Sequence, residues 1–252
     1  MKFNDFEKQI VRCQTLDELF TLWREAHKAE ENYKETTVDG IDKNTFVADG
    51  YIDENCYYKS DYKTLFILKE ANIKEYNVGI DSSQVGFYTD YINDGKPNIP
   101  KQQEKIGRMA YYLQNGENET AKMPSEVQLK NALKYTAFMN INKRGGAKST
   151  NSPKINAYYN KYEQFIKKEI EIINPNCIVI IGTTEANDNI NKFAAENKIR
   201  TINMWHTAYR MSRQKRSDNP IYALSNNGSE PDKNVDCYMR KFFETAQSSE
   251  TL

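Results

Sequence analysis

The sequence has no long hydrophobic run. Its longest apolar stretch is about six residues, whereas a membrane-spanning helix needs about 20. The first residues, Met1–Asp5, also lack the apolar core of a signal peptide. These absences predict a cytoplasmic protein with no membrane partner.

Cysteine and histidine are scarce. The 252 residues include four Cys and two His, and no Cys pair has CxxC spacing. Structural zinc sites and iron–sulfur clusters need such closely spaced ligands. We therefore expect free thiols, no metal and no cofactor. His27 lies among acidic residues with no second ligand nearby, so we expect it to be a surface side chain.

A net charge is also absent, because 35 basic residues balance 35 acidic ones. This excludes a protein that coats nucleic acid over its whole surface. The charges are unevenly spread along the chain. Residues 30–61 carry nine acidic and three basic side chains, whereas residues 134–168 carry eight basic side chains and one acidic side chain. A second basic stretch spans residues 206–216. Each basic stretch is either a solvated face or one side of a local DNA contact.

Aromatic bulk is present, with 17 Tyr, 11 Phe and 2 Trp at a mean hydropathy of −0.82. Such a chain can fill a core, and its length fits one domain with an appendage. We predict an N-terminal helical extension with an acidic loop over residues 1–60, an α/β domain over 61–245 and a tail over 246–252. Richness in Asn, Lys and Ile is typical of AT-rich bacterial genomes.

Four apolar segments alternate with segments of helical periodicity. The apolar segments span residues 64–68, 135–141, 177–182 and 200–205. Continuous apolar runs of this length are typical of strands covered on both faces. The pattern predicts a three-layer α/β/α fold with a central parallel sheet of about four strands.

Polar residues follow each of the four predicted strands. They are Lys69–Asn72, Asn140–Lys143, Gly182–Glu185 and His206–Thr207. Open parallel sheets bind ligands outside the carboxyl ends of their strands, so these groups are candidates for one site. A carboxylate, amides, hydroxyls and an imidazole can activate water and stabilise developing charge. Strand ends are also polar simply where they reach solvent.

The order of these motifs resembles the uracil-DNA glycosylase superfamily, and most closely its thermostable bacterial and archaeal branch. Leu65–Asn72 is similar to a strand followed by Gly-Glu-Ala-Pro-Gly, and Ala137–Lys143 to a strand that ends in a base-binding asparagine. Ile173–Gly182 resembles the helix end, proline and apolar strand that come next. Trp205–Ala208 stands where that family has His-Pro-Ser. The likeness covers about residues 61–245.

The resemblance implies an enzyme that hydrolyses the N-glycosidic bond of a base in single- or double-stranded DNA. By position, Glu70 would orient or deprotonate the attacking water, and His206 would stabilise negative charge on the departing base. Asn140 would pair with the edge of the base. Further candidates for base binding are Asn72, Phe87 and Tyr88.

A glycosylase must also extrude its base, which requires phosphate contacts and a wedge side chain. The basic stretches and the residues after the histidine motif supply candidates, and Tyr209 and Met211 are the candidate wedges. The predicted DNA-binding residues are Lys143, Arg144, Tyr209, Arg210, Met211 and Arg213.

The sequence departs from the family pattern at four places. Lys69 replaces a glycine, Asn72 replaces a proline, and Thr207 and Ala208 replace Pro-Ser. The cluster-binding cysteines of that branch also have no counterpart. Two alternatives therefore stay open. One is a non-catalytic module that binds a nucleobase, a nucleotide or DNA on the same fold. The other is a structural or host-interaction protein with a degenerate site.

Overall fold

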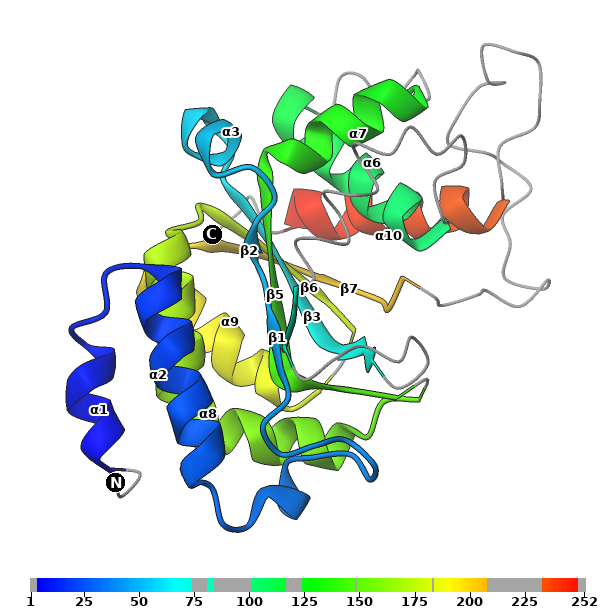
Figure 1. Ribbon diagram of the computed structural model, residues 1–252. Helices are drawn as coiled ribbons and strands as arrows, with labels where there is room; N and C mark the ends of the chain where they lie inside the picture. The colour runs from blue at the N-terminus through cyan, green and yellow to red at the C-terminus, as the bar shows by residue number, and fades with distance from the viewer. Residues whose placement is uncertain are drawn as a thin grey trace.

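The fold is a five-stranded sheet between two layers of helices (Figure 1). The prediction of a three-layer α/β/α architecture is confirmed. The structure is a computed structural model that describes residues 4–73, 81–83, 101–116, 124–147, 149–182, 184–207 and 233–248.

The helices and strands of the described residues have the following bounds. The helices are α1 (Asn4–Ile10), α2 (Leu16–Ala29), the 3₁₀ helix η1 (Tyr33–Glu35), α3 (Glu54–Lys59), α6 (Lys101–Asn115), α7 (Glu126–Lys134), α8 (Ser152–Ile173), α9 (Ala186–Glu196) and α10 (Lys233–Ser248). The strands are β1 (Phe46–Ala48), β2 (Gly50–Tyr51), β3 (Thr64–Asn72), β4 (Asp81–Ser83), β5 (Thr136–Gly146), β6 (Cys177–Ile181) and β7 (Arg200–Met204).

The central sheet has the strand order β2-β5-β3-β6-β7. Strands β3, β5, β6 and β7 are parallel and are the four strands that the apolar segments predict. The fifth strand, β2, pairs antiparallel with β5 and comes from the segment before residue 60. Strands β1 and β4 form a separate parallel pair.

Strands β3 and β5 extend further than their apolar segments. We expected them to end at Leu68 and Ile141, but backbone pairing continues to Glu70 opposite Asn142 and, after a register shift, to Asn72 opposite a glycine. Polarity marks where side chains leave the core, whereas the hydrogen-bond ladder continues as long as a neighbouring strand accompanies it. The polar residues after β3 are therefore held within the sheet.

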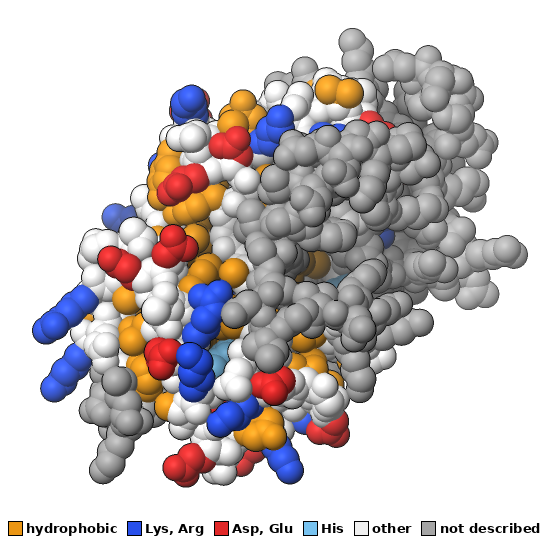
Figure 2. Space-filling model, viewed as in Figure 1, with side chains coloured by type: hydrophobic (Ala, Val, Ile, Leu, Met, Phe, Trp, Pro, Cys, Tyr) orange, Lys and Arg blue, Asp and Glu red, His pale blue; other side chains and the backbone are white. Residues whose placement is uncertain are grey.

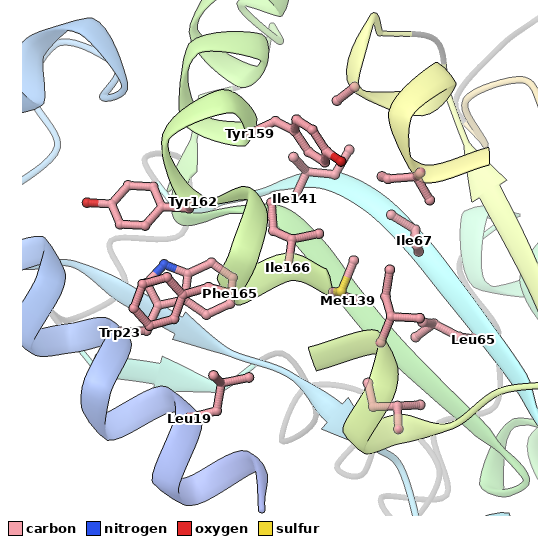
Figure 3. Packing of buried hydrophobic residues seen from close by; sticks show 14 of the residues in the cluster. Leu19, Trp23, Leu65, Ile67, Met139, Ile141, Tyr159, Tyr162, Phe165 and Ile166 are labelled. Carbon is pink, nitrogen blue, oxygen red and sulfur yellow. The ribbon is translucent and has the colours of Figure 1, made fainter. Parts of the chain in front are cut away.

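The two faces of the sheet bury two separate sets of side chains. Leu65 and Ile67 face α2, α8 and α9, whereas Phe66 faces α6, α7 and α10. On the first face, the Trp23 ring of α2 stacks on Phe165 of α8, with ring centroids 5.0 Å apart (Figure 3). This alternation is what a strand covered on both sides requires.

Local capping signals fix where several helices begin and end. Capping boxes at Thr15 and Ser125 begin α2 and α7, and the sequence carries their spacing in Glu18 and Gln128, each three residues further on. Asn151 caps α8, and Asn174 ends that helix in the left-handed conformation. None of the helices in the described part of the chain has the length and apolar character needed to cross a membrane.

The N-terminal segment shares the main core. Phe6 of α1 and Trp23 of α2 belong to the same buried cluster as the sheet residues Leu65 and Met139. Strand β2 covers the edge of β5. Residues before 60 therefore contribute both a strand and core side chains to the α/β fold.

Candidate active site

The sheet has a topological switch point between β3 and β6. Strand β3 leads to α6 on one face of the sheet, whereas β6 leads to α9 on the opposite face. Neighbouring parallel strands whose connections diverge in this way leave a crevice outside their carboxyl ends. The residues at that place are Lys69 and Glu70 of β3 and Gly182, which follows β6.

Glu70 supplies a carboxyl group at this end of the sheet, on the side of β3 that faces β5. Its Oε2 accepts a hydrogen bond of 3.3 Å from Asn142 Nδ2. Its Oε1 is buried and has no hydrogen-bond partner within the described residues. Burial raises the pKa of Glu70 to about 7, against the lowering effects of Asn142 and Lys69. Glu70 can therefore both accept and release a proton near neutral pH.

Asn142 positions the Glu70 carboxyl. Its Nδ2 also donates to the Gly145 carbonyl at 3.3 Å, and its Oδ1 accepts from the Arg144 amide at 3.0 Å. Both ends of the amide are thus held by the backbone of β5. Sequence reasoning missed this role of Asn142 and selected Asn140, which lies on the same strand but donates to Asp49.

Gly146 provides the space that Glu70 occupies. A Cβ at Gly146 would overlap the Glu70 carboxyl group. We expect Gly146→Ala to displace that carboxyl towards solvent, because a side-chain terminus moves more easily than a strand. The pKa of Glu70 should then fall towards its ordinary value, which a carbon-13 NMR titration of the carboxyl would show. An unchanged titration midpoint would contradict this role for Gly146.

Lys69 extends to the other side of β3 and lies over Gly182. A Cβ at Gly182 would stand 2.6 Å from Lys69 Cε, and the φ of +94° also requires glycine there. The Gly182 backbone is fixed, since its N–H donates to Met204 at 2.8 Å and its carbonyl accepts from Asn187 at 2.6 Å. Partial burial lowers the pKa of Lys69, while Glu70 raises it.

His206 lies just after β7 at the same end of the sheet. Two hydrogen bonds fix the residues that follow β7. The Tyr238 hydroxyl donates to the Trp205 carbonyl at 2.7 Å. Lys105 Nζ donates to the Thr207 carbonyl, also at 2.7 Å. Partial burial and the positive charges of Lys69 and Lys105 lower the pKa of His206. The imidazole is therefore neutral at pH 7 and can donate a hydrogen bond without carrying charge.

Asn140 lies beside a buried carboxylate. Its side chain is fully buried, and both its backbone N–H and its Nδ2 donate to Asp49 Oδ2, the latter at 3.4 Å. Asp49 lies between β1 and β2, beyond the other edge of β5. The predicted base contact of Asn140 is corrected, because its amide is fully buried and donates to Asp49.

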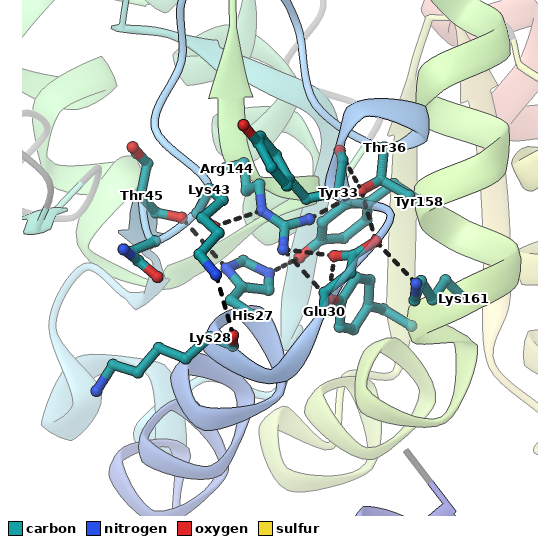
Figure 4. Close-up of polar contacts among 12 residues, drawn as sticks. His27, Lys28, Glu30, Tyr33, Thr36, Lys43, Thr45, Arg144, Tyr158 and Lys161 are labelled. Carbon is teal, nitrogen blue, oxygen red and sulfur yellow. Dashed lines mark hydrogen bonds and ion pairs between the residues drawn. The ribbon is translucent and has the colours of Figure 1, made fainter. Parts of the chain in front are cut away.

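Lys143 and Arg144 are likewise buried rather than presented to DNA, and both side chains have no exposed surface. Lys143 pairs with Asp49 and, at 2.8 Å, with Glu169 of α8. The prediction that Lys143 and Arg144 contact phosphates is wrong in this structure, because core carboxylates already neutralise them. Arg144 pairs with Glu30 and also donates to Thr36 and to the Lys43 carbonyl (Figure 4).

The acidic and basic stretches of the sequence therefore meet inside the molecule. Lys154 and Lys161 of the basic stretch also pair with Asp39 and Glu30 of the acidic one. On the described part of the face in Figure 2, acidic and basic side chains are interspersed rather than segregated. Core pairing thus accounts for Lys143, Arg144, Glu30 and Asp49 among the charges of the two stretches.

His27 is also buried, contrary to the expectation of a surface side chain. Its Nε2 lies 2.7 Å from the Tyr158 hydroxyl, and its Nδ1 lies 3.2 Å from the Thr45 carbonyl. Burial and the Arg144 charge lower the pKa of His27, so the ring is neutral. Within the described residues, no three His, Cys, Asp or Glu side chains gather as a metal site would require.

The remaining predicted residues are only partly placed. Asn72 is half-buried at the end of β3, opposite Gly146 in the register. The other candidates for base and DNA binding lie outside the described residues, namely Phe87, Tyr88, Tyr209, Arg210, Met211 and Arg213.

Fold and site together define an α/β protein with a carboxyl, an amine and an imidazole at the carboxyl edge of its sheet. Comparisons with family models, with curated proteins and with solved structures gave no match. The chemistry of this edge therefore carries the functional argument.

Proposed function

We propose that this protein is a uracil-DNA glycosylase-like hydrolase that cleaves the N-glycosidic bond of a base in DNA. The observation that carries the proposal is Glu70, a buried carboxyl group with a pKa of about 7 at the switch point of the sheet. A general base works best when its pKa lies near the working pH. The order of strand-end motifs supports DNA as the substrate.

The two titratable groups fit the two needs of this hydrolysis. Ionised Glu70 accepts a proton from water, the water oxygen bonds to C1′ of the sugar, and the bond from C1′ to the base breaks. The base leaves with that electron pair. Neutral His206 stabilises the resulting negative charge by a hydrogen bond. Asn142 acts on Glu70 and so is a positioning residue.

Base release from oligonucleotides tests the proposal. Single-stranded and mismatched substrates should carry uracil, hypoxanthine or an alkylated base. We expect release by the wild type, with a loss of about 10²–10⁴-fold in Glu70→Gln and a clear loss in His206→Ala. Glu196→Gln, an exposed change at the end of α9, should retain full release. No release by the wild type, or equal release by all the variants, would reject the hydrolase.

The rate should depend on pH through Glu70. Because only the ionised carboxylate accepts a proton, kcat/KM should rise as pH increases and level off above the pKa of about 7. A pH profile measured from pH 5 to 9 would check this. In Gly146→Ala, the midpoint of the kcat/KM profile should shift to lower pH. An unshifted profile would show that a group other than Glu70 causes the rise with pH.

A second candidate function is a module that binds a nucleobase or nucleotide without cleaving it. Lys69, Thr207 and Ala208 favour it, because they stand where the family has the residues that contact the sugar and the base. Tight, salt-sensitive binding of an oligonucleotide without product would support the module, and measured turnover would exclude it.

A further inference from the structure

Three buried charged side chains meet on the face of the sheet that α2 and α8 cover. Lys143 Nζ of β5 donates to Asp49 Oδ1 at 2.5 Å and to Glu169 Oε1 of α8 at 2.8 Å. None of the three side chains has exposed surface. An amine and two carboxyl groups are thus held in contact away from bulk water.

We infer that Lys143 and Asp49 condense to an amide, an intramolecular isopeptide bond, with Glu169 as the group that moves the protons. The three residues would then form a site of self-modification that links the segment before β2 covalently to β5. The inference goes beyond the proposed hydrolase and does not depend on it, because it uses no residue to which that hydrolase gives a chemical role.

The surroundings of the amine remove the usual obstacle to such a condensation. In water, amines and carboxyl groups stay apart because solvation stabilises the ammonium and carboxylate ions. Lys143 Nζ instead lies over the buried rings of Phe20 and Trp23, at 5.5 and 5.3 Å from their centroids. Burial makes an ion pair costly, since solvation is lost on both sides. The amide is neutral, so its formation removes this cost.

Asp49 is the carboxyl group that is prepared for attack. Its Oδ1 contacts the lysine nitrogen, and its Oδ2 accepts from the Asn140 backbone N–H at 2.6 Å and from Asn140 Nδ2 at 3.4 Å. Attack on Cγ places negative charge on Oδ2, where these fixed donors stabilise it. Groups oriented in this way react as if at effective concentrations on the order of 10⁵–10⁸ M.

Glu169 can carry the protons, because it is bonded to the same nitrogen as Asp49. Burial and the Asp49 carboxylate raise the pKa of Glu169, against the lowering effect of Lys143. The rise favours the protonated carboxyl group that can act as a general acid.

The reaction balances without a further reactant. The Lys143 ammonium gives one proton to Asp49 Oδ1, its nitrogen bonds to Cγ, and negative charge gathers on Oδ2. Protonated Glu169 then gives its proton to Oδ1, the bond from Cγ to Oδ1 breaks, and water leaves as the carbonyl at Oδ2 re-forms. Ionised Glu169 takes the extra proton from the nitrogen. One amide and one water result, and Glu169 returns to its starting state.

Two simpler alternatives use the same residues. One is a permanent ion pair, which leaves the mass of the chain unchanged. The other is a succinimide, which forms when the nitrogen of Gly50 attacks the side chain of the preceding Asp49 and which also releases water. Lys143→Arg separates these alternatives from the isopeptide bond, because arginine keeps the positive charge but does not supply the amine.

Mass spectrometry of the denatured full chain tests the inference. We expect the wild type to weigh one water molecule less than its sequence requires. Trypsin should release a branched peptide that joins residues 44–59 to residues 135–144, with Lys143 uncleaved. Lys143→Arg should have its full mass, and Glu169→Gln should form the bond at least about tenfold more slowly. Glu171→Gln, an exposed change on the same helix, should form it as the wild type does.

The outcomes decide between the three reactions. A full mass in the wild type after prolonged incubation of the folded chain would overturn the isopeptide bond, as would a branch between Lys143 and Glu169. A loss of water that persists in Lys143→Arg would identify the succinimide instead. Undiminished bond formation in Glu169→Gln would overturn the role of that carboxyl group. The branched peptide is detected in the wild type itself, so the test does not depend on whether a variant folds.

Discussion

Lys143→Met should lower the free energy of unfolding by about 3–5 kcal/mol. Lys143 has no exposed surface and pairs with Asp49 and Glu169, both fully buried. Burial and the nearby Asp49 carboxylate raise the pKa of Glu169 well above its ordinary value, and Lys143 opposes this rise. The variant leaves these buried carboxyl groups without their cation. Urea denaturation at pH 7 would measure the loss.

Two variants show whether charge or packing causes the effect. Lys28→Met removes an ion pair with Glu25 that is more than half exposed on both sides, and should change stability by less than about 1 kcal/mol. Lys143→Met combined with Asp49→Asn should recover part of the loss, because the uncompensated charge is removed as well. A loss as small as that of Lys28→Met would show that the buried pairing contributes little.

Glu70→Gln should raise the free energy of unfolding by about 3 kcal/mol at pH 8 while it removes activity. Burial raises the pKa of Glu70 from 4.5 to about 7 in the folded state. Between these values the folded chain holds more protons than the unfolded chain, so wild-type stability falls as pH rises. Above pH 7 the full cost of an ionised buried carboxylate is present. Glutamine has the same shape and no charge.

The pH dependence gives this prediction its own control. Below about pH 4.5 the wild-type carboxyl is protonated in both states, so wild type and Glu70→Gln should unfold with nearly equal free energies. Thermal and urea unfolding at pH 4 and pH 8 would measure both differences. A constant difference between the two proteins at all pH values would show that Glu70 does not titrate in the folded state as proposed.

The strand and helix pattern was predictable because it depends on local signals. Continuous apolar runs marked the four parallel strands, and the capping boxes at Thr15 and Ser125 marked two helix starts. The ends of β3 and β5 were not predictable, because pairing beyond Leu68 depends on the partner strand rather than on side-chain polarity.

The site was predictable only in part. Because Glu70 and His206 each follow a predicted strand, the sequence placed both at the carboxyl edge of the sheet. Asn142 was missed, because the predicted strand ended at Ile141. Its contact with Glu70 exists only because β5 continues beside β3 to Asn142 and beyond. The buried role of Arg144 could not be read from the sequence, since its partner Glu30 is 114 residues away along the chain.

The core charge pairs also determine when the chain can fold during synthesis. Glu30 and Asp49 leave the ribosome long before Lys143, Arg144 and the α8 residue Glu169 exist. Until then the early carboxylates stay hydrated, and the N-terminal helices have only an incomplete surface to pack on. Folding is therefore a late, cooperative event that joins both ends of the sequence. A fragment begun at residue 61 would lack Glu30, the carboxylate that pairs with Arg144, and Asp49, one of the two that pair with Lys143.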